Sequence, residues 1–229
     1  MKSVKRTLSP ATTKGLLRPL ARAWKKYVQT FPGDSEDRQP VHSVYGGAHL
    51  FKSDTAKKFS DLSLKALRES APGPAVLASA LHLDPRLADT VYNRVVHKLE
   101  TEAVEDFRLD FEDGYGNRPD AEEDAHAASA ALEVAEGYDA KTLPPFIGIR
   151  IKPLTAELAA RSLRTTDIFL STLLARTRNR LPDGFVVTLP KIVAPEQVAI
   201  TAKALGAIEK AHRLKPGTLR MELMVETTQ

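Results

Sequence analysis

The chain has 229 residues, 42% of them hydrophobic, which is enough to bury a sizeable core and argues against overall disorder. The absence of cysteine excludes a disulfide framework, a thiolate metal site and a cysteine nucleophile, and no apolar run approaches the roughly 20 residues of a membrane span. The net charge of +4 arises from the first 30 residues, which hold eight Lys or Arg and no Asp or Glu, so the remainder is acidic. We therefore expect a soluble, cytoplasmic protein with neither a nucleic-acid nor a membrane partner.

Residues 1–40 are expected to form a basic leader and a connector. Lysines and arginines surround leucines and Trp24 over residues 16–26, a pattern typical of a basic amphipathic helix that packs on the body of the protein. A transit peptide and a local nucleic-acid patch are alternative interpretations of the same start. Pro19 suits such a helix only near its first turn. Residues 31–40 contain turn-forming residues and no helical or strand periodicity, which is typical of a connector. One domain is therefore expected to span residues 41–229.

From residue 41 onward, short β-rich runs alternate with longer helical patterns. The expected strands cover residues 41–45, 104–112, 146–151, 185–189 and 219–226. The expected helices cover residues 56–69, 86–99, 120–136, 156–179 and 195–212, and in the second of these an apolar residue recurs every four positions. This alternation predicts parallel strands with right-handed crossovers, in either a doubly wound sheet or a (β/α)8 barrel.

The two faces of the expected strands favour the barrel. Phe107, Leu109 and Phe111 share one face of the second strand, whereas its other face is ionic. The third and the last strands repeat this division. A doubly wound sheet is covered by helices on both faces and would be apolar on both. We therefore predict an α/β fold, an incomplete (β/α)8 TIM barrel of about five of eight βα units, with a basic helical leader.

Charged residues of the ionic face fall into two groups. Deep in the predicted barrel, Arg108, Asp110 and Glu222 are interpreted as a structural salt-bridge network, because buried charges persist only when they are paired or bind a metal. Residues at the carboxyl ends of the strands lie where such barrels carry their active sites, and we interpret them as functional. They are the glycine pair Gly46 and Gly47, and the charged residues Glu112, Asp113, Arg150, Lys191 and Glu226.

Four short motifs occur at successive strand ends: DFED from Asp110, RIKP from Arg150, LPK ending at Lys191, and ET from Glu226. In order and spacing they resemble the D-x-E-D, R-I-N-P, L-P-K and E-T runs of the HpcH/HpaI aldolase and citrate lyase β-subunit family, within the phosphoenolpyruvate/pyruvate barrel superfamily. The resemblance covers residues 41–229.

The resemblance implies a carbon–carbon lyase or aldolase that requires Mg2+, with Mn2+ as an alternative, and acts on a small 2-oxo acid or an acyl thioester. It implies that Glu226 is a metal ligand, that Arg150 holds the substrate's carboxylate and oxo oxygen, and that Glu112 and Asp113 act near the metal through its waters. Lys191 and the glycine pair are expected to contact the substrate, and a homo-oligomer is compatible with the family. Such chemistry passes through an enolate, which a hard cation and an arginine fork stabilise.

The chain also departs from the family pattern. Lys152 stands where the family has asparagine, and Tyr115 and Gly116 follow the acidic run after Gly114. The family's second metal ligand, an aspartate after a sixth strand, would lie beyond Gln229. Because five strands cannot close an eight-stranded barrel, we expect a divergent branch that is truncated after the fifth strand.

Other interpretations remain open. Phosphoryl transfer on phosphoenolpyruvate or pyruvate occurs on the same scaffold in the wider superfamily, and a non-catalytic scaffold protein would keep the barrel without its chemistry. The general base is open between a metal-bound water, one of the acids and His49, which also fits an ordinary loop histidine. Four further histidines lack metal-ligand spacing and are interpreted as structural or surface residues, namely His82, His97, His126 and His212.

Overall fold

A computed structural model describes residues 7–33 and 36–228. The chain divides into two compact units, Met1–Gln39 and Pro40–Gln229. The division falls one residue before the boundary expected from the sequence.

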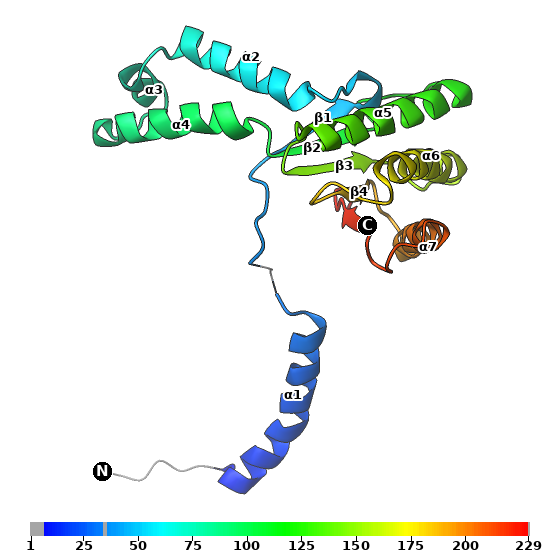
Figure 1. The fold of residues 1–229 in the computed structure, drawn as a ribbon. Coiled ribbons are helices and arrows are strands. Elements are labelled where there is room, and N and C mark those ends of the chain that lie inside the picture. The colour runs from blue at the N-terminus through cyan, green and yellow to red at the C-terminus, as the bar shows by residue number, and fades with distance from the viewer. Residues whose placement is uncertain (1–6, 34–35, 229) are drawn as a thin grey trace. The chain divides into compact units, whose positions relative to one another are not determined.

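The first unit contains the helix α1 (Pro10–Thr30) (Figure 1). Ser9 caps its start by accepting a hydrogen bond from the amide of Thr12 at 3.1 Å, and Pro10 occupies the first turn. The expectation that Pro19 lies near the first turn is wrong, because the Ser9 cap starts the helix earlier and leaves Pro19 in its interior. Pro19 has no N–H to donate to the carbonyl of Gly15, so the helix lacks one hydrogen bond there.

The second unit is built on one parallel sheet whose strands follow chain order (Figure 1). The strands are β1 (Ser43–Gly47), β2 (Asp106–Asp110), β3 (Phe146–Arg150), β4 (Val186–Leu189) and β5 (Arg220–Leu223). All four neighbouring pairs are parallel. The prediction of an α/β fold with five parallel strands is therefore confirmed.

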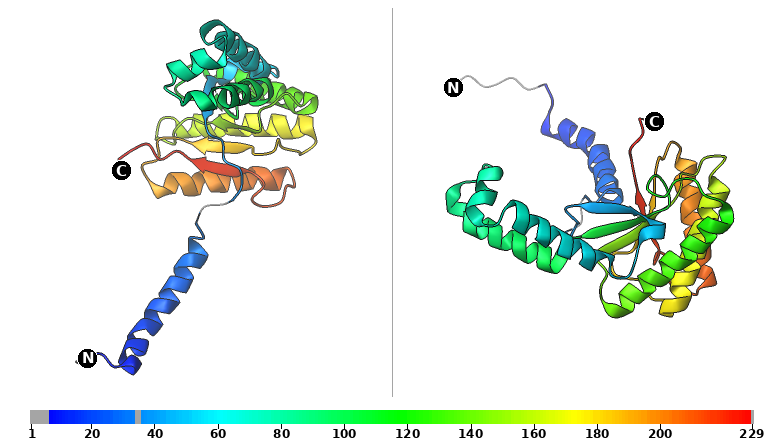
Figure 2. Two further views of the ribbon diagram at one scale, coloured as in Figure 1. Left: turned by 90° about the vertical axis from the view of Figure 1, so that its left-hand side faces the viewer. Right: turned by 90° about the horizontal axis from the view of Figure 1, so that it is seen from above.

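Helices connect the strands on crossovers of unequal length. The first crossover carries α2 (Thr55–Ser70), α3 (Pro74–Ala80) and α4 (Ala88–Glu102), with 3-10 turns at Ala48–Leu50 and Pro85–Leu87. The later crossovers carry α5 (Asp120–Ala140), α6 (Ala159–Thr177) and α7 (Pro195–Ala211). Figure 2 shows α5, α6 and α7 side by side along one face of the sheet, whereas α2, α3 and α4 form an arm beside β1. None of the helices in the described residues is long and apolar enough to cross a bilayer.

The core lies between the sheet and α5 and α6. Leu109, Ile147, Ile149 and Val187 have no exposed surface and pack against the helices, as the apolar faces of their strands predict. The prediction is wrong in part for the last strand. Leu219 and Met221 pack on the core there, whereas Leu223 is 45% exposed at the edge of the sheet and Val225 is 85% exposed.

Several strands are shorter than expected. Glu112 and Glu226, which were expected as the last residues of two strands, instead lie in the segments that follow β2 and β5. The first strand is shifted toward the C-terminus, so Gly46 and Gly47 are its last two residues. The predicted site residues therefore remain at the carboxyl edge of the sheet: Gly46, Gly47 and Arg150 end their strands, and the others lie in the segments that follow the strands.

Candidate functional site at the carboxyl edge of the sheet

The strand register brings three of the strand ends into line. Gly47 pairs with Asp110, Asp110 pairs with Arg150, and Arg150 pairs with Thr188. Because parallel strands end on the same edge, the segments that follow them meet there (Figure 1).

Asp110 and Arg150 form the central ion pair of this edge. Nε of Arg150 donates to Oδ1 of Asp110 at 2.8 Å, and Nη2 donates to Oδ2 at 2.5 Å. Asp110 also accepts from the amides of Glu112 at 2.9 Å and Gly114 at 2.7 Å. Burial raises the pKa of Asp110, but the bonds from Arg150 and the two amides outweigh it, so the pKa lies below its ordinary value. Asp110 is thus a buried carboxylate that holds both the arginine and the following turn.

The rest of the Arg150 guanidinium faces other site groups. Its central carbon lies 4.6 Å from the centroid of the Tyr45 ring, within the range of a cation–π contact. Nε lies 3.4 Å from Glu112, and Nη2 lies 4.0 Å from Asp113. Nη1 contacts only the sulfur of Met224 among the described residues, at 4.0 Å, and sulfur is a weak acceptor. Nη1 therefore retains donor capacity for a ligand.

Lys191 brings the remaining acids together. Its Nζ donates to Asp113 at 2.8 Å and forms an ion pair with Glu112, while its backbone amide donates to Glu226 at 2.9 Å. The hydrogen bond to Asp113 and the ion pair with Glu112 raise the pKa of Lys191 above its ordinary value, so the side chain is an ammonium at neutral pH. Its φ angle of 49° places it in the left-handed region, which is unfavourable for a residue with a side chain.

Glu112 is the most unusual acid of the cluster. Its oxygens are buried and lie in ion pairs with Arg150 and Lys191, but no contact within the described part of the chain meets the directional requirements of a hydrogen bond. Buried carboxylate oxygens normally accept such bonds, so the ion pairs with Arg150 and Lys191 are what stabilise this carboxylate.

Acids outnumber bases in the cluster. Three carboxylates, from Asp110, Glu112 and Asp113, contact the cations of Arg150 and Lys191, and a fourth, from Glu226, accepts from the Lys191 backbone amide. No three histidine or acidic residues within residues 7–33 and 36–228 are arranged to hold a metal ion. Carboxylate oxygens are nevertheless the ligands that hard dications prefer, and the net formal charge of the cluster is about −2.

A second ionic group lies on the same face, deeper in the sheet. Arg108 forms an ion pair with Asp106 and bonds to Glu222 at 3.1 Å and 3.2 Å. The predicted network of Arg108, Asp110 and Glu222 is therefore wrong in one member. Asp106 lies two residues from Arg108 on the same strand face, whereas the register places Asp110 beside Arg150.

The glycine pair allows β1 to approach its surroundings closely. A Cβ atom on Gly47 would lie 2.5 Å from the carbonyl oxygen of Gly114, and one on Gly46 would lie 2.7 Å from the Phe107 ring. Gly47 thus borders the acidic turn directly. Contact of the two glycines with a substrate stays a prediction.

His49 lies beside a different set of residues. Arg118 donates to its Nε2 at 3.3 Å, and its ring packs near Tyr115 and His126. Burial and the neighbouring Arg118 lower the pKa of His49, so its imidazole is neutral at pH 7. Two other histidines make local contacts, since His126 is bonded to Tyr115 at 2.8 Å and His212 to Ser171 at 3.2 Å.

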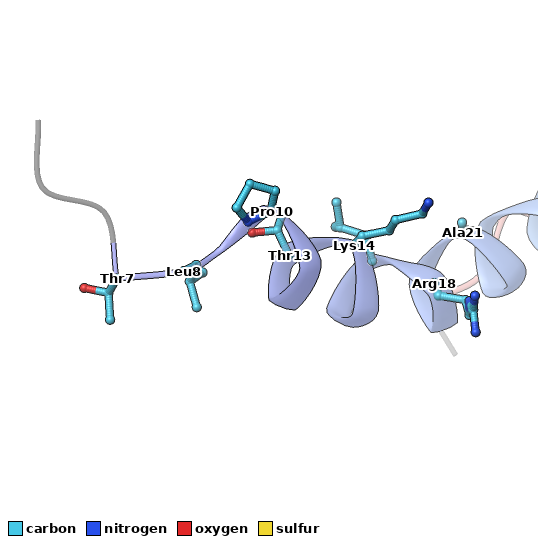
Figure 3. Close-up of a pocket in the computed structure, with 8 residues that line it drawn as sticks. Thr7, Leu8, Pro10, Thr13, Lys14, Arg18 and Ala21 are labelled. Carbon is cyan, nitrogen blue, oxygen red and sulfur yellow. The ribbon is translucent and has the colours of Figure 1, made fainter.

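A hollow runs along α1 in the first unit (Figure 3). It is lined only by residues of this helix and the segment before it, from Thr7 to Ala21. A single helix cannot enclose a cavity, so this hollow carries no argument for a site.

Sequence reasoning missed two members of the carboxyl edge. Asp110 was expected in the deep network, although its place directly before Glu112 and Asp113 in one acidic run was a signal that it belongs with them. Tyr45 was not singled out, and only the register of β1 against β2 shows that it shares a face with Arg108.

These features define an α/β protein whose parallel sheet gathers paired and unpaired carboxylates around one arginine and one lysine at its carboxyl edge. A family model described as a domain of unknown function, DUF6986, matches residues 20–229, so the chain belongs to the DUF6986 family. The match includes the second half of α1 as well as the whole second unit. No curated protein matches the chain.

Proposed function

We propose that the protein is a metal-dependent carbon–carbon lyase or aldolase that acts on a small 2-oxo acid or an acyl thioester through an enolate, on a scaffold of the (β/α)8 type. The observation that supports this most strongly is the convergence of Arg150, Lys191 and four carboxylates at the carboxyl edge of a parallel sheet. Active sites of such scaffolds occur at this edge.

Arg150 is proposed to bind the substrate's carboxylate or enolate oxygen. Asp110 holds two of its nitrogens, and Tyr45 lies against its face, so the guanidinium is fixed before any ligand arrives. Nη1 is the nitrogen that remains for the ligand. A pre-oriented donor of this kind stabilises developing negative charge without reorganisation.

Glu226 is proposed to hold Mg2+ or Mn2+, with Glu112 and Asp113 acting through water. When bound, such an ion acts as a Lewis acid for negative charge on oxygen. Glu226 is exposed and bonded only to the amide of Lys191 among the described residues. The excess of carboxylates over cations also favours a dication.

Lys191 is proposed to act as a cation rather than as a nucleophile. Because Asp113 and Glu112 keep its side chain protonated at neutral pH, it carries no free amine for a Schiff base. The charged ammonium instead suits the orientation of an anionic substrate.

A non-catalytic scaffold is the second candidate, and one observation favours it. Lys191 pairs with both Glu112 and Asp113, so a cation of the chain itself balances two of the acids.

Calorimetric titration with Mn2+ distinguishes the two candidates. The protein is expected to bind the ion, and Glu226→Gln is expected to weaken binding by at least about tenfold because a charged oxygen ligand is lost. Glu100→Gln on the exposed side of α4 is the matched control and should leave binding unchanged. Binding that ignores Glu226, or no binding, would remove the metal-dependent proposal and favour the scaffold.

A further inference from the structure

We propose that Lys152, two residues after the end of β3, is a positioning residue that holds the acidic turn of residues 111–116 so that Glu112 and Asp113 face Arg150 and Lys191. What the turn does chemically rests on the proposed function. The Lys152 side chain is only 6% exposed. A buried ammonium is costly unless its donors are satisfied, so the groups that satisfy it are informative.

Two of these groups are backbone carbonyls at the two ends of the turn. Nζ of Lys152 donates to the carbonyl oxygen of Phe111 at 2.6 Å and to that of Gly116 at 3.3 Å. Glu112 and Asp113 lie between these two points. The ammonium also lies 5.0 Å from the centroid of the Tyr115 ring, which belongs to the same turn. One side chain therefore joins both ends of the segment that carries the two acids.

The counter-ion of Lys152 fixes it to the helical layer. Nζ lies 3.1 Å from Glu123, whose side chain is 1% exposed and which lies in the first turn of α5. Glu123 also accepts a hydrogen bond from Thr165 of α6 at 2.6 Å and lies 3.5 Å from Arg161. The position of the ammonium is thus set by two helices as well as by β3.

Asp110 holds the same turn through the other set of backbone groups. It accepts from the amides of Glu112 and Gly114, whereas Lys152 donates to carbonyls. Within the turn, the amides of Tyr115 and Gly116 bond to the carbonyl of Glu112 at 3.0 Å and 2.8 Å. Without Lys152, the carbonyls of Phe111 and Gly116 lose their charged donor, and the side-chain bonds that remain to the backbone of the turn are those from Asp110 and Arg118.

The test compares Lys152→Met with Arg161→Met in the full chain. Both variants remove a cation from Glu123, but within residues 7–33 and 36–228 Arg161 forms no hydrogen bond or ion pair with the turn, so it is a matched control for loss of charge pairing. Hydrogen exchange of the turn amides is measured against the amides of α7, together with Mn2+ affinity. If Lys152→Met does not fold, the double variant Lys152→Met with Glu123→Gln replaces it, because this variant leaves no unpaired carboxylate at position 123.

Lys152→Met is expected to accelerate exchange in the turn by about tenfold or more, as loss of hydrogen bonds from a charged donor implies. It is also expected to weaken Mn2+ binding by about tenfold to a hundredfold, the usual effect of losing a group that orients a ligand. Arg161→Met should change neither. The positioning role is overturned if the turn amides exchange at the same rate in the two variants. It is also overturned if Lys152→Met exchanges faster in the turn but keeps its affinity for Mn2+. Absence of Glu226-dependent Mn2+ binding in the unmodified protein overturns the proposed function instead, and the exchange comparison then decides the role of Lys152 by itself.

Discussion

At the scale of single residues, the two cations of the carboxyl edge are held in different ways. Arg150 has a side chain that is 11% exposed and forms a two-point contact with Asp110, whereas the Lys191 side chain is 41% exposed. Exposed pairs contribute little to stability, while removing one partner of a buried pair leaves an uncompensated charge. Arg150 is therefore expected to be structurally important as well as functional.

Arg150→Met is predicted to lower the free energy of unfolding by about 3 kcal/mol or more, because it leaves Asp110 and Glu112 buried without their arginine. Urea denaturation of the two proteins measures the difference. The double variant with Asp110→Asn is the control, and it should lose less than the sum of the two single variants because the residues are in contact. Additive losses would show that the pair is not coupled.

The pKa of His49 is predicted to lie below 6.5, because burial and Arg118 disfavour the charged imidazole. The folded protein then binds this proton less readily than the unfolded chain. The stability that neutral His49 contributes is present above pH 6.5 and is lost as the pH falls toward the folded pKa. An NMR titration of the ring proton measures the midpoint.

Arg118→Met provides the control for this titration, since it removes the neighbouring positive charge and should move the midpoint upward. A midpoint at or above 6.5 in the unmodified protein would contradict the assignment of His49 as a neutral residue at pH 7.

Which residues share the ionic face could be predicted from the sequence, but not which of them pair. Alternation along β2 places Asp106, Arg108 and Asp110 on one face, and all three are buried there. The choice of Asp106 for Arg108 and of Asp110 for Arg150 depends on the register between strands and on side-chain reach. A single sequence contains neither quantity.

At the scale of elements, the pattern of apolar residues predicted every strand and the five longer helices of the second unit to within a few residues. The helix α3 (Pro74–Ala80) was missed because it has seven residues, of which only Ala78 is buried, and too few turns to show a helical period. The predicted strands were too long at their ends, because the alternation of apolar and polar residues continues into the turns that follow the strands. Glu112 is an example.

Gly148→Ala is predicted to destabilise the sheet by about 1–3 kcal/mol through overpacking. Gly148 pairs with Val186 of β4, and an added Cβ would lie 2.2 Å from the Val186 carbonyl oxygen, so the strands must separate. Urea denaturation measures the loss.

Gly206→Ala in α7 is the control, because nothing lies within 4 Å of its added Cβ. It should stabilise the protein by about 0.5–1 kcal/mol, the gain of alanine over glycine in a helix. Equal stability of the alanine variants at positions 148 and 206 would show that the contact at Gly148 is relieved without cost.

At the scale of the whole molecule, the two units are predicted to differ in their part in folding. The cluster of buried hydrophobic residues runs from Ala48 to Leu219 and lies entirely in the second unit. A chain that starts at Pro40 is therefore expected to keep its circular dichroism spectrum and one cooperative thermal transition. Loss of that transition would show that residues 1–39 are needed for the core to form.

The α/β class and the parallel order of the sheet followed from the alternation of strands and helices, and both are confirmed. Closure into a barrel stays a prediction. The division of each strand into an apolar and an ionic face indicates which environment each face meets, but it does not give the number of strands in the sheet. The lyase function also stays a prediction, because motif order places Glu112, Arg150, Lys191 and Glu226 on one edge without testing their chemistry.

The central claim is enolate chemistry at the carboxyl edge, and exchange of the methyl protons of pyruvate in D2O tests it most directly. With Mg2+ present, the protein is predicted to accelerate this exchange above the rate in buffer with Mg2+ alone, and both Glu226→Gln and Arg150→Lys are predicted to abolish the acceleration while the proteins stay folded. A rate equal to that of the buffer, or an acceleration that survives both substitutions, would contradict the account.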